Sequence, residues 1–439
     1  MRMHSARRKK KIQIVEEDLQ MKLVYSFIYT GSRNEELLRM CKSAKDLYNQ
    51  SLYIVKQELK ENNRWLSYYD LDKIMKTTKN LDGEINYYKL KSQTSQQILK
   101  KLSSNISTYI KSIKDWSKNK NKYKGKPNFP KYKDKTSFET LVYTNQNSII
   151  KNGCIYLSKT MKIRIPQYDK YSEDLFNYNQ VTVKYMGDNK FKIYITYDKN
   201  CINTNLNKDE YMSIDLGVDN LCTIVNTVNG RAEIVNGKQI KSINQYYNKQ
   251  LSKHKSILET NNKLKTSKNI RKITAIRNNK INDLFHNISR WIINTSIDNG
   301  IGNIVVGYNR DWKDSIRIGH RNNQTFVSIP YLKLIQYLDY KCKLVGINLI
   351  LHEEGYTSKC DSLTLEKVEK HDVYSGKRIK RGLFQSGVGK LINADVNGSI
   401  NILRKVVDDS VVKTQIINSG LLFNPIKYNN LYNLNCCGL

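Results

Sequence analysis

Paired cysteines, acidic side chains and long apolar runs are all scarce in this sequence. Its eight cysteines are scattered, and no two of them have the C-x-x-C spacing on which four-cysteine zinc sites usually rely. The G-x-S-x-G nucleophile elbow of α/β hydrolases and the Walker P-loop are also absent. These absences argue against a four-cysteine zinc site, an α/β hydrolase and a P-loop NTPase. The isolated thiols are typical of a protein in a reducing compartment.

The sequence has no segment suited to a membrane. No stretch of its 439 residues approaches the ~18 uninterrupted apolar residues of a membrane-spanning helix. Residues 1–20 form a basic extension, and no apolar run precedes Met21, which argues against a secretory signal. We therefore expect a cytoplasmic protein that does not contact a membrane.

Acidic residues are too few to balance the basic ones. The chain has 74 Lys and Arg against 40 Asp and Glu, which gives a formal net charge of +34. Such a charge destabilises a compact protein by self-repulsion unless a polyanion neutralises it. A compositional bias toward Lys, Asn, Ile and Tyr is the alternative, but it does not account for the shortage of acids. Because phosphates bind Lys and Arg with release of counterions, the composition predicts a protein that binds DNA or RNA.

The pattern of apolar residues divides the chain into two halves. A single core rarely exceeds ~250–300 residues, so we expect at least two domains. In the second half, strands come first and helices then alternate with strands, which predicts a mixed α/β sheet. The expected elements are strand 23–29, helices 35–62 and 95–116, strands 154–165, 181–186, 191–197 and 211–216, a hairpin turning at Asn229-Gly230, a helical pair in 241–299, strand 303–306, helix 330–345, strand 347–352 and a helix after Asp395.

A lysine-rich run with almost no aliphatic residues lies at 117–135. Aromatic residues interleave with its lysines, and the combination of stacking and positive charge suits nucleic acid. A solvated linker is the alternative interpretation. The candidate nucleic-acid-binding residues of this run are Lys124, Lys126, Lys131, Tyr132 and Lys133.

Four acidic residues lie in or beside apolar segments. Asp215 lies within an apolar strand, Glu353 and Glu354 follow another, and Asp395 opens a helix. A buried carboxylate is costly unless it is paired or binds a cation. Taken singly, each has an ordinary explanation: a structural salt bridge, an exposed strand end or a helix N-cap. The helix after Asp395 also has small residues and regularly spaced asparagines, namely Ala394, Gly398 and Ser399, and Asn393, Asn397 and Asn401.

Taken together, these acids predict a metal site. Three carboxylates at the ends of neighbouring strands and on an adjacent helix can hold two Mg²⁺ ions about 3.5–4 Å apart, which clamp the attacking and leaving oxygens of a phosphodiester. Mg²⁺ prefers oxygen ligands of this kind. The pattern therefore favours a Mg²⁺-dependent phosphodiester hydrolase that uses Asp215, Asp395 and one of Glu353 and Glu354.

The order of these motifs resembles the TnpB family of transposon-encoded, RNA-guided nucleases. SIDLGVDNLCTIV resembles the first RuvC motif of that family, and INADVNGSINILRK resembles the third. IVVGYNRDWK, NNQTFVSIPYLKLIQYLDYKCKLVGI and EEGYTSKCDSL match between them, and KGKPNFPKYK and the helix after Gln93 match in the first half. The resemblance covers residues 21–405.

The resemblance implies a multidomain α+β protein with an RNase H-like (RuvC) α/β nuclease domain. It also implies an RNA-guided DNA endonuclease whose partners are a guide RNA from the transposon end and double-stranded target DNA with a short adjacent motif. The implied layout is a β-barrel wedge domain from 21–45 and 140–205, a helical recognition domain inserted at 46–139, the RuvC domain at 206–405 and an unassigned tail at 406–439.

Two departures from the family pattern concern the metal sites. The second RuvC motif usually has a glutamate where this sequence has Gly307, while a subset of the family has it just before the YTS segment. Glu353 and Glu354 fit that second place, and we favour Glu354 because alternation places it on the same face as His352. The zinc ribbon implied at 357–392 has Cys360 as its only cysteine, so we expect no zinc.

Two further residues and two other functions complete the prediction. Trp312 and Lys313, in NRDWK, are candidates for base stacking and phosphate contact. A nuclease-inactive, RNA-guided repressor is the main alternative, and the retained Asp215 and Asp395 argue against it. A transposase that performs strand transfer is the third possibility. It is not supported, because the sequence shows no tyrosine nucleophile flanked by a pair of histidines.

Overall fold

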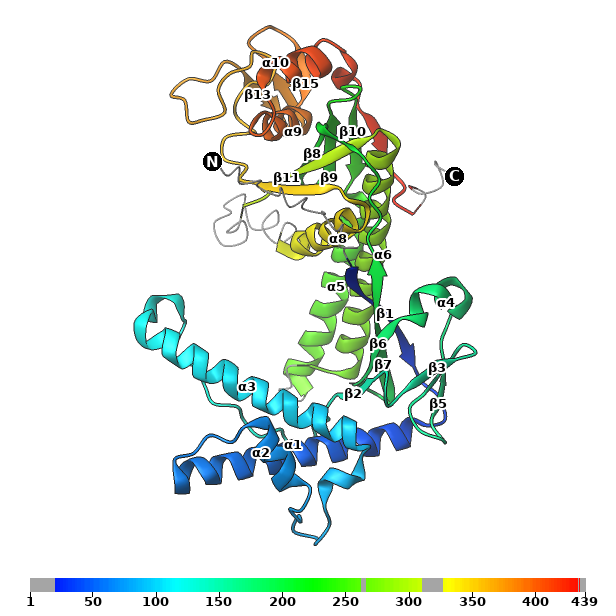
Figure 1. The fold of residues 1–439 in the computed structure, drawn as a ribbon. Helices are drawn as coiled ribbons and strands as arrows, with labels where there is room; N and C mark the ends of the chain where they lie inside the picture. Colours follow the sequence, from blue (N-terminus) through cyan, green and yellow to red (C-terminus); the bar gives the residue numbers. More distant parts are fainter. Residues whose placement is uncertain (1–19, 262–265, 310–326, 433, 435–439) are drawn as a thin grey trace, which may run out of the picture. The chain divides into compact units, whose positions relative to one another are not determined.

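The structure is a computed structural model that describes residues 20–261, 266–309, 327–432 and 434. The chain divides into two compact units, Met1–Asn200 and Cys201–Leu439 (Figure 1). Residues 1–19 of the expected basic extension lie outside the described residues, and so do Trp312 and Lys313. In the described ranges, no helix combines the length and the apolar character needed to cross a membrane.

Unit 1 contains two antiparallel sheets. In sheet order, their strands are β1 (Gln20–Tyr29), β7 (Lys190–Asn200), β6 (Tyr178–Gly187) and β2 (Leu141–Thr144), and then β3 (Ile149–Lys151), β4 (Cys154–Tyr156) and β5 (Lys162–Arg164). β1 and β7 pair along their whole length, from Gln20 opposite Asn200 to Tyr29 opposite Phe191. In the part of the chain that the structure describes, β1 and β2 are the outer strands of the larger sheet, so its closure into a barrel stays a prediction.

Two long helices, α1 (Asn34–Asn62) and α3 (Ser92–Lys118), form most of the helical part of unit 1. Each buries one apolar face, so the helices expected at 35–62 and 95–116 are confirmed. The expected domain boundary at residue 45 falls inside α1. Four short helices are not among the expected elements: α2 (Tyr68–Met75), η1 (Asn86–Lys89), η2 (Lys120–Lys122) and α4 (Tyr168–Phe176). The capping box formed by Ser67 and Asp70 was the available signal for α2.

A buried ion-pair cluster fastens the end of the basic loop to this helical core. The carboxylate of Glu139, which is only 2% exposed, accepts from Lys101 Nζ at 2.7 Å and forms an ion pair with Lys133 Nζ at 2.8 Å. Burial alone would raise the pKa of Glu139, but hydrogen bonds from both lysines and from Thr140 N outweigh it and lower that pKa.

We expect Glu139→Gln to lower the free energy of unfolding of unit 1 by about 1–3 kcal/mol at pH 7, because two lysines lose a charged partner. The pKa of Glu139 is lower in the folded protein than in the unfolded chain, where it is about 4.3. The charged carboxylate therefore stabilises the fold fully above that unfolded pKa, and this contribution is lost as the pH falls through the folded pKa. The difference between wild type and variant should therefore shrink in acid. Hydrogen exchange of α1 and α3 measures it, and Asp134→Asn, an exposed acid of the same loop, is the control. A difference independent of pH would contradict the ion-pair explanation.

Unit 2 is built on a six-stranded mixed sheet. In sheet order, its strands are β12 (Asn348–His352), β11 (Ile301–Gly307), β8 (Asn207–Leu216), β9 (Asn220–Asn226), β10 (Ala232–Asn236) and β16 (Ile426–Tyr428). β8, β9 and β10 are antiparallel neighbours, whereas β11 runs parallel to β8 and β12. The expected mixed sheet and the hairpin at Asn229-Gly230 are therefore confirmed, and the two strands expected at 303–306 and 347–352 are parallel neighbours.

Helices cover both faces of this sheet (Figure 1). They are α5 (Lys238–Asn261), α6 (Lys268–Asp298), α8 (Tyr331–Val345) and α9 (Ala394–Arg404). Met212 and Ile214 of β8 pack in one core with α6 and α8, whereas Val305 of β11 packs in a second core with α9. β11 is buried along its whole length, since it lies between two parallel neighbours under both layers. The helical pair expected within 241–299 is confirmed as α5 and α6.

The chain before and after α9 completes unit 2. A small antiparallel sheet of β13 (Lys377–Lys380), β14 (Leu383–Gln385) and β15 (Leu391–Asn393) leads into α9. After α9 come α10 (Asp409–Val411), the π-helix η3 (Val412–Ile417) and η4 (Leu421–Phe423). The described residues of the expected tail at 406–439 pack onto unit 2, because β16 pairs with β10 and Leu431 lies in the core.

Candidate active site

Asp215 lies near the carboxyl end of β8, on the face covered by α9. Alternation along β8 turns Ser213 and Asp215 toward that helix. Ser213 Oγ lies 2.9 Å from Ser399 Oγ, and Asp215 Oδ2 lies 2.9 Å from the position that a Cβ on Gly398 would take. The small residues of α9 thus permit a close approach, which places the Asp215 carboxylate against the first turns of the helix.

Asp395 lies in the first turn of α9, next to Asp215. The N-cap is Asn393, whose side chain accepts from Asp395 N and Val396 N, so a capping role does not explain Asp395. The Asp395 carboxylate accepts from Asn220 Nδ2 at 2.7 Å and lies 3.7 Å from the guanidinium of Arg378. Sequence reasoning missed both of these partners, because only the fold brings β9 and β13 beside the start of α9.

The two aspartates repel each other. Burial and the charge of Asp395 raise the pKa of Asp215 to about 7, and Arg378 offsets part of this effect. A pair of carboxylates in this state favours a nearby cation, because a cation would stabilise the charged form of both.

Glu354 enters the same region from the end of β12. The strand ends at His352, so the expected alternation of Glu353 and Glu354 along a strand does not apply. Glu353 is exposed, while the side chain of Glu354 turns over β11, with Oε1 2.5 Å and Cγ 2.6 Å from where a Cβ on Gly307 would lie. Glu354 N donates to Asn309 Oδ1 at 3.0 Å. Gly307 therefore leaves room for the carboxylate of a residue that follows the neighbouring strand.

Tyr331, the first residue of α8, relates Glu354 to Asp215. Its hydroxyl donates to Gly217 O at 2.8 Å. Burial raises the pKa of Tyr331, and the charges of Cys222, Asp215 and Glu354 raise it further. Because β8 and β11 are parallel neighbours, Asp215 and Gly307, over which Glu354 turns, lie at the same end of the sheet. The structure thus brings Asp215, Asp395 and Glu354 to one end of the sheet.

Two basic residues, one from α5 and one from the turn after β13, pair with a further acid close in sequence to Asp215. Arg381 and Lys241 form ion pairs with Asp219, four residues after Asp215. Burial would raise the pKa of Asp219, but these two cations lower it. The charge of Asp219 is therefore balanced by two cations of the protein. In this respect Asp219 differs from Asp215 and Asp395, which repel each other.

Comparisons with known proteins agree on one family. A family model for probable transposases (OrfB_IS605) matches residues 194–313, and a model for the TNB domain of Cas12f1-like proteins matches residues 331–402. The TnpB-like protein ORF457 of Acidianus two-tailed virus is 24% identical over 204 residues, which are 44% of this chain and 41% of that protein. The chain belongs to the TnpB family. In this TnpB-family chain, Asp215 lies in the first matched segment, and Glu354 and Asp395 lie in the second.

Solved structures share the fold of this TnpB-family chain at low identity. Cas12f1, in its complex with sgRNA and target DNA, matches with a TM-score of 0.51 and 15% identity, over 84% of this chain and 82% of that one. A mini-RNA-guided endonuclease, CRISPR-Cas_phi3, matches with a TM-score of 0.45 and 9% identity, over 90% of this chain and 92% of that one. The Cas12f1 likeness supports a mixed α/β multidomain fold.

The candidate nucleic-acid-binding residues of this TnpB-family chain differ in their surroundings. Lys124, Lys126, Lys131 and Tyr132 are exposed, and Lys56 Nζ lies 4.0 Å from the ring centre of Tyr132. Lys133 is less available, because Glu139 neutralises its charge. All of these residues lie in unit 1, whereas the carboxylates lie in unit 2.

The zinc-ribbon region of this TnpB-family chain gathers Cys360, Glu366 and His371, whose ligand atoms lie within 4.8 Å of one another. Each side chain already has a partner within the protein. The Glu366 carboxylate accepts from Asp361 N and Ser375 N at 2.9 and 2.7 Å, His371 Nε2 lies 2.7 Å from Lys367 O, and Cys360 Sγ donates to Glu369 O. Burial also raises the pKa of the Cys360 thiol, which disfavours the thiolate that zinc needs. These residues therefore fit zinc poorly.

The absence of zinc stays a prediction. We expect the purified full chain to contain far less than one equivalent of zinc. The three side chains that could bind it, Cys360, Glu366 and His371, already form hydrogen bonds within the protein. Elemental analysis with and without added zinc, and the same measurement on Cys360→Ser, test it. Stoichiometric zinc that Cys360→Ser releases would contradict the expectation.

Proposed function

We propose that this chain is an RNA-guided DNA endonuclease that hydrolyses phosphodiester bonds with Mg²⁺ held by Asp215, Glu354 and Asp395. The observation that supports it most is that these three acids lie at one end of the sheet, where Asp215 approaches α9 at Gly398 and Gly307 leaves room for Glu354. Carboxylate oxygens are the donors that Mg²⁺ prefers. When bound, the metal ions would supply a hydroxide nucleophile and stabilise charge on the leaving oxygen.

The residues of the chain would orient this chemistry. Asn220 and Arg378 hold the Asp395 carboxylate, and the Tyr331 hydroxyl donates to Gly217 O, two residues after Asp215. The strand order β10-β9-β8-β11-β12, with three antiparallel strands followed by two parallel ones, fits an RNase H-like (RuvC) domain. We place the nuclease domain at 206–405 and propose that 21–45 with 140–205 forms the wedge domain around the recognition domain at 46–139.

The partners follow from charge and family. A net charge of +34 favours a long polyanion, and the Cas12f1 structure of similar fold is a complex with guide RNA and target DNA. We propose a guide RNA that pairs with target DNA, while the protein reads a short adjacent motif. Lys124, Lys126, Lys131 and Tyr132 are proposed contacts to nucleic acid on unit 1.

The test begins with the bound RNA. The full chain is co-expressed with RNA from the genomic 3′ flank of its gene, purified, and the bound RNA is sequenced. The complex is then incubated with a plasmid library in which randomised bases adjoin a target that matches the guide. The incubation contains either Mg²⁺ or EDTA. We expect one specific RNA and Mg²⁺-dependent cutting beside one motif. Specific RNA and target binding without cutting would favour the repressor, and no specific RNA would contradict the guided mechanism.

A further inference from the structure

The four-residue spacing of asparagines on α9 has a structural consequence outside the metal ligands. Asn393 caps the helix, while Asn397, Asn401 and Lys405 follow at intervals of four and therefore lie on one face. This face contacts the segment 353–362, which begins with Glu353 and Glu354. Both Asn397 and Asn401 are fully buried.

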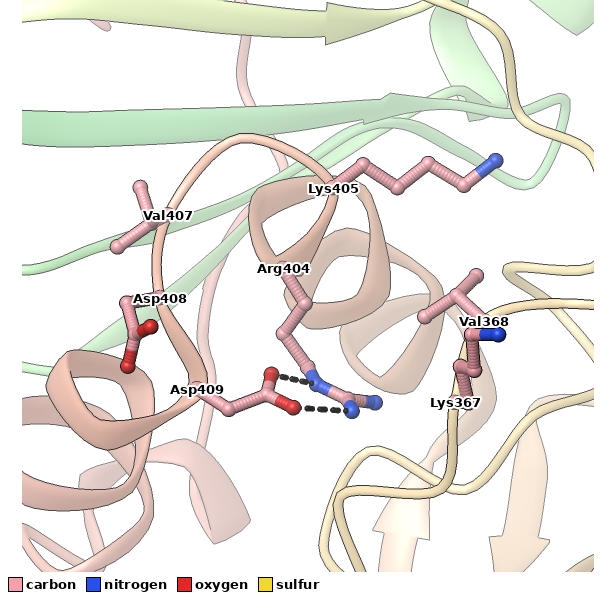
Figure 2. A pocket seen from close by; sticks show the side chains of 7 residues that line it. All are labelled: Lys367, Val368, Arg404, Lys405, Val407, Asp408 and Asp409. Carbon is pink, nitrogen blue, oxygen red and sulfur yellow. Dashed lines mark hydrogen bonds and ion pairs between the residues drawn. The ribbon is translucent and has the colours of Figure 1, made fainter.

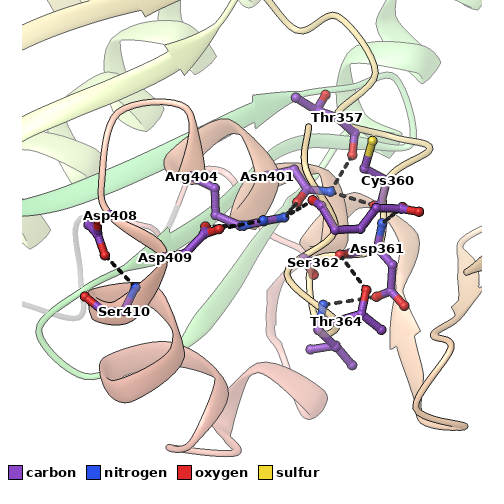
Figure 3. Close-up of polar contacts among 12 residues, drawn as sticks. Thr357, Cys360, Asp361, Ser362, Thr364, Asn401, Arg404, Asp408, Asp409 and Ser410 are labelled. Atoms are coloured by element: carbon purple, nitrogen blue, oxygen red, sulfur yellow. Dashed lines mark hydrogen bonds and ion pairs between the residues drawn. The ribbon is translucent and has the colours of Figure 1, made fainter. Parts of the chain in front are cut away.

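Each side chain of this face binds backbone groups of that segment. Asn397 Nδ2 donates to Cys360 O at 2.8 Å, and its Oδ1 accepts from Ser362 N at 2.9 Å. Asn401 Nδ2 donates to Thr357 O at 2.9 Å and to Cys360 O at 2.7 Å, as Figure 3 shows. These bonds pair buried backbone groups that would otherwise lack partners within the segment.

The segment is also held on either side of Glu354. Lys405 Nζ donates to Glu353 O at 2.8 Å and to Gly355 O at 2.9 Å. Thr357 Oγ1 donates to Glu354 O at 2.9 Å. Lys405 thus holds the residues on either side of Glu354 to the end of α9, and Thr357 connects the carbonyl of Glu354 to Asn401.

Arg404 fixes the orientation of the Asn401 amide. Its guanidinium forms a two-point ion pair with Asp409, as Figure 2 shows, at 2.6 and 3.0 Å. Its remaining amine donates to Asn401 Oδ1 and to Glu366 O, each at 2.9 Å. Because Asn401 Oδ1 accepts from an arginine, its amide nitrogen must face the carbonyls of Thr357 and Cys360.

We propose that Asn397, Asn401 and Lys405 are positioning residues that set Glu354 at the distance from Asp215 and Asp395 that a shared metal site requires. Helix α9 carries Asp395 in its first turn and contacts Asp215 at Gly398. Its asparagine and lysine side chains bind the backbone of the segment that carries Glu354. The three carboxylates come from three separate parts of the chain: α9 contains Asp395, lies against Asp215, and holds the backbone on either side of Glu354. This inference rests on the proposed metal site and adds the residues that determine its geometry.

The test measures metal affinity rather than cutting. Mn²⁺ is titrated into the nucleic-acid-free full chain, and the unbound ion is followed by electron paramagnetic resonance. Loss of a residue that supports a metal ligand typically weakens metal binding about 10–100-fold. We expect Asn401→Ala to weaken Mn²⁺ binding by at least about tenfold, and excess Mn²⁺ to restore cleavage by the guided complex.

Matched variants separate positioning from general destabilisation. Asn303, near the other end of β11, is a buried asparagine whose Nδ2 donates to Lys208 O at 2.6 Å, so Asn303→Ala removes a comparable bond away from the site. It should lower the melting temperature but leave Mn²⁺ affinity unchanged. If Asn401→Ala does not fold, Thr357→Val, which loses only the hydroxyl bond to Glu354 O, should weaken Mn²⁺ binding, whereas Thr357→Ser should bind it like wild type.

Two outcomes overturn the inference, and they are distinguishable. If Asp215→Asn abolishes Mn²⁺ binding while Asn401→Ala and Thr357→Val bind it like wild type, the metal site stands and the positioning role falls. If Asp215→Asn itself binds Mn²⁺ like wild type, the proposed ligand set falls, and the positioning role falls with it.

Discussion

Asp215→Asn is expected to abolish target DNA cleavage while making the metal-free protein more stable. A carboxylate ligand contributes several kcal/mol of charge stabilisation through its metal, and each 1.36 kcal/mol is tenfold in rate, so the loss should be on the order of 10³ or more. Without metal, Asp215 is a half-buried carboxyl whose pKa is raised by loss of solvent around it and by the charge of Asp395. A neutral amide of the same shape removes that repulsion.

Thermal unfolding with and without Mg²⁺ separates the two effects. Mg²⁺ should raise the melting temperature of wild type by binding the folded state, and should leave that of Asp215→Asn nearly unchanged. Asp209→Asn is the control, because Asp209 is an exposed aspartate of the same strand. A variant that cuts DNA like wild type, or one whose melting temperature still rises with Mg²⁺, would show that Asp215 does not hold the metal.

Glu354→Ala is expected to lose cleavage to a similar extent, and an acid moved to position 307 is expected to restore part of it. Gly307 and His352 are opposite each other in the parallel pair of β11 and β12, and the Glu354 side chain fills the space above Gly307. A glutamate at 307 in the absence of the Glu354 side chain would therefore emerge beside the same two aspartates. Restoration should be partial, because a Cβ at 307 would lie 2.6 Å from Ile402 Cδ1 and that side chain must turn away.

Three comparisons make this result specific. The double variant Gly307→Glu, Glu354→Ala is measured against Gly307→Ala, Glu354→Ala, which has the added Cβ but no carboxylate. Gly307→Ala alone should lower the cleavage rate about 10²-fold, because its Cβ displaces the Glu354 carboxylate and small misplacements cost this much. Glu353→Ala should cut DNA at close to the wild-type rate, because Glu353 points to solvent. If Glu353→Ala fails and Glu354→Ala cuts, the assignment of the two glutamates is reversed.

The strands and helices around the site could be predicted because their apolar patterns are regular. The apolar run at 303–306 became β11, which is buried on both faces, and the periodicity of 330–345 became α8. Small or polar-rich segments were harder to predict. α2 has only a capping box and eight residues, and the chain after residue 405 has little periodicity, although β16 completes the edge of the sheet.

The two glutamates illustrate a limit of reasoning from alternation. From the sequence, the choice between Glu353 and Glu354 rests on the face of the strand on which each would lie. In the structure the strand ends at His352, and the following chain turns, with a left-handed φ of 65° at Tyr356. The favoured residue is the one that turns inward, yet a loop held by α9 orients it rather than the pleat of a sheet. Arg378 and Asn220, both in contact with Asp395, had no signal in the sequence, because their roles depend on a hairpin and a strand end that only folding brings together.

The sequence by itself determined the chemical class of this protein: a strongly basic chain with acids placed in apolar segments, in an order that resembles one nuclease family. These properties are local or additive, and they are therefore readable without coordinates. Only the tertiary structure decided which glutamate faces the aspartates, that Asn393 rather than Asp395 caps α9, and that Gly307 leaves space instead of marking a lost acid. The positions of Glu354 and Gly307 depend on atoms far apart in the chain, which the packing of α9 against the sheet brings together. The cap depends on which of two neighbouring side chains turns back toward the start of the helix.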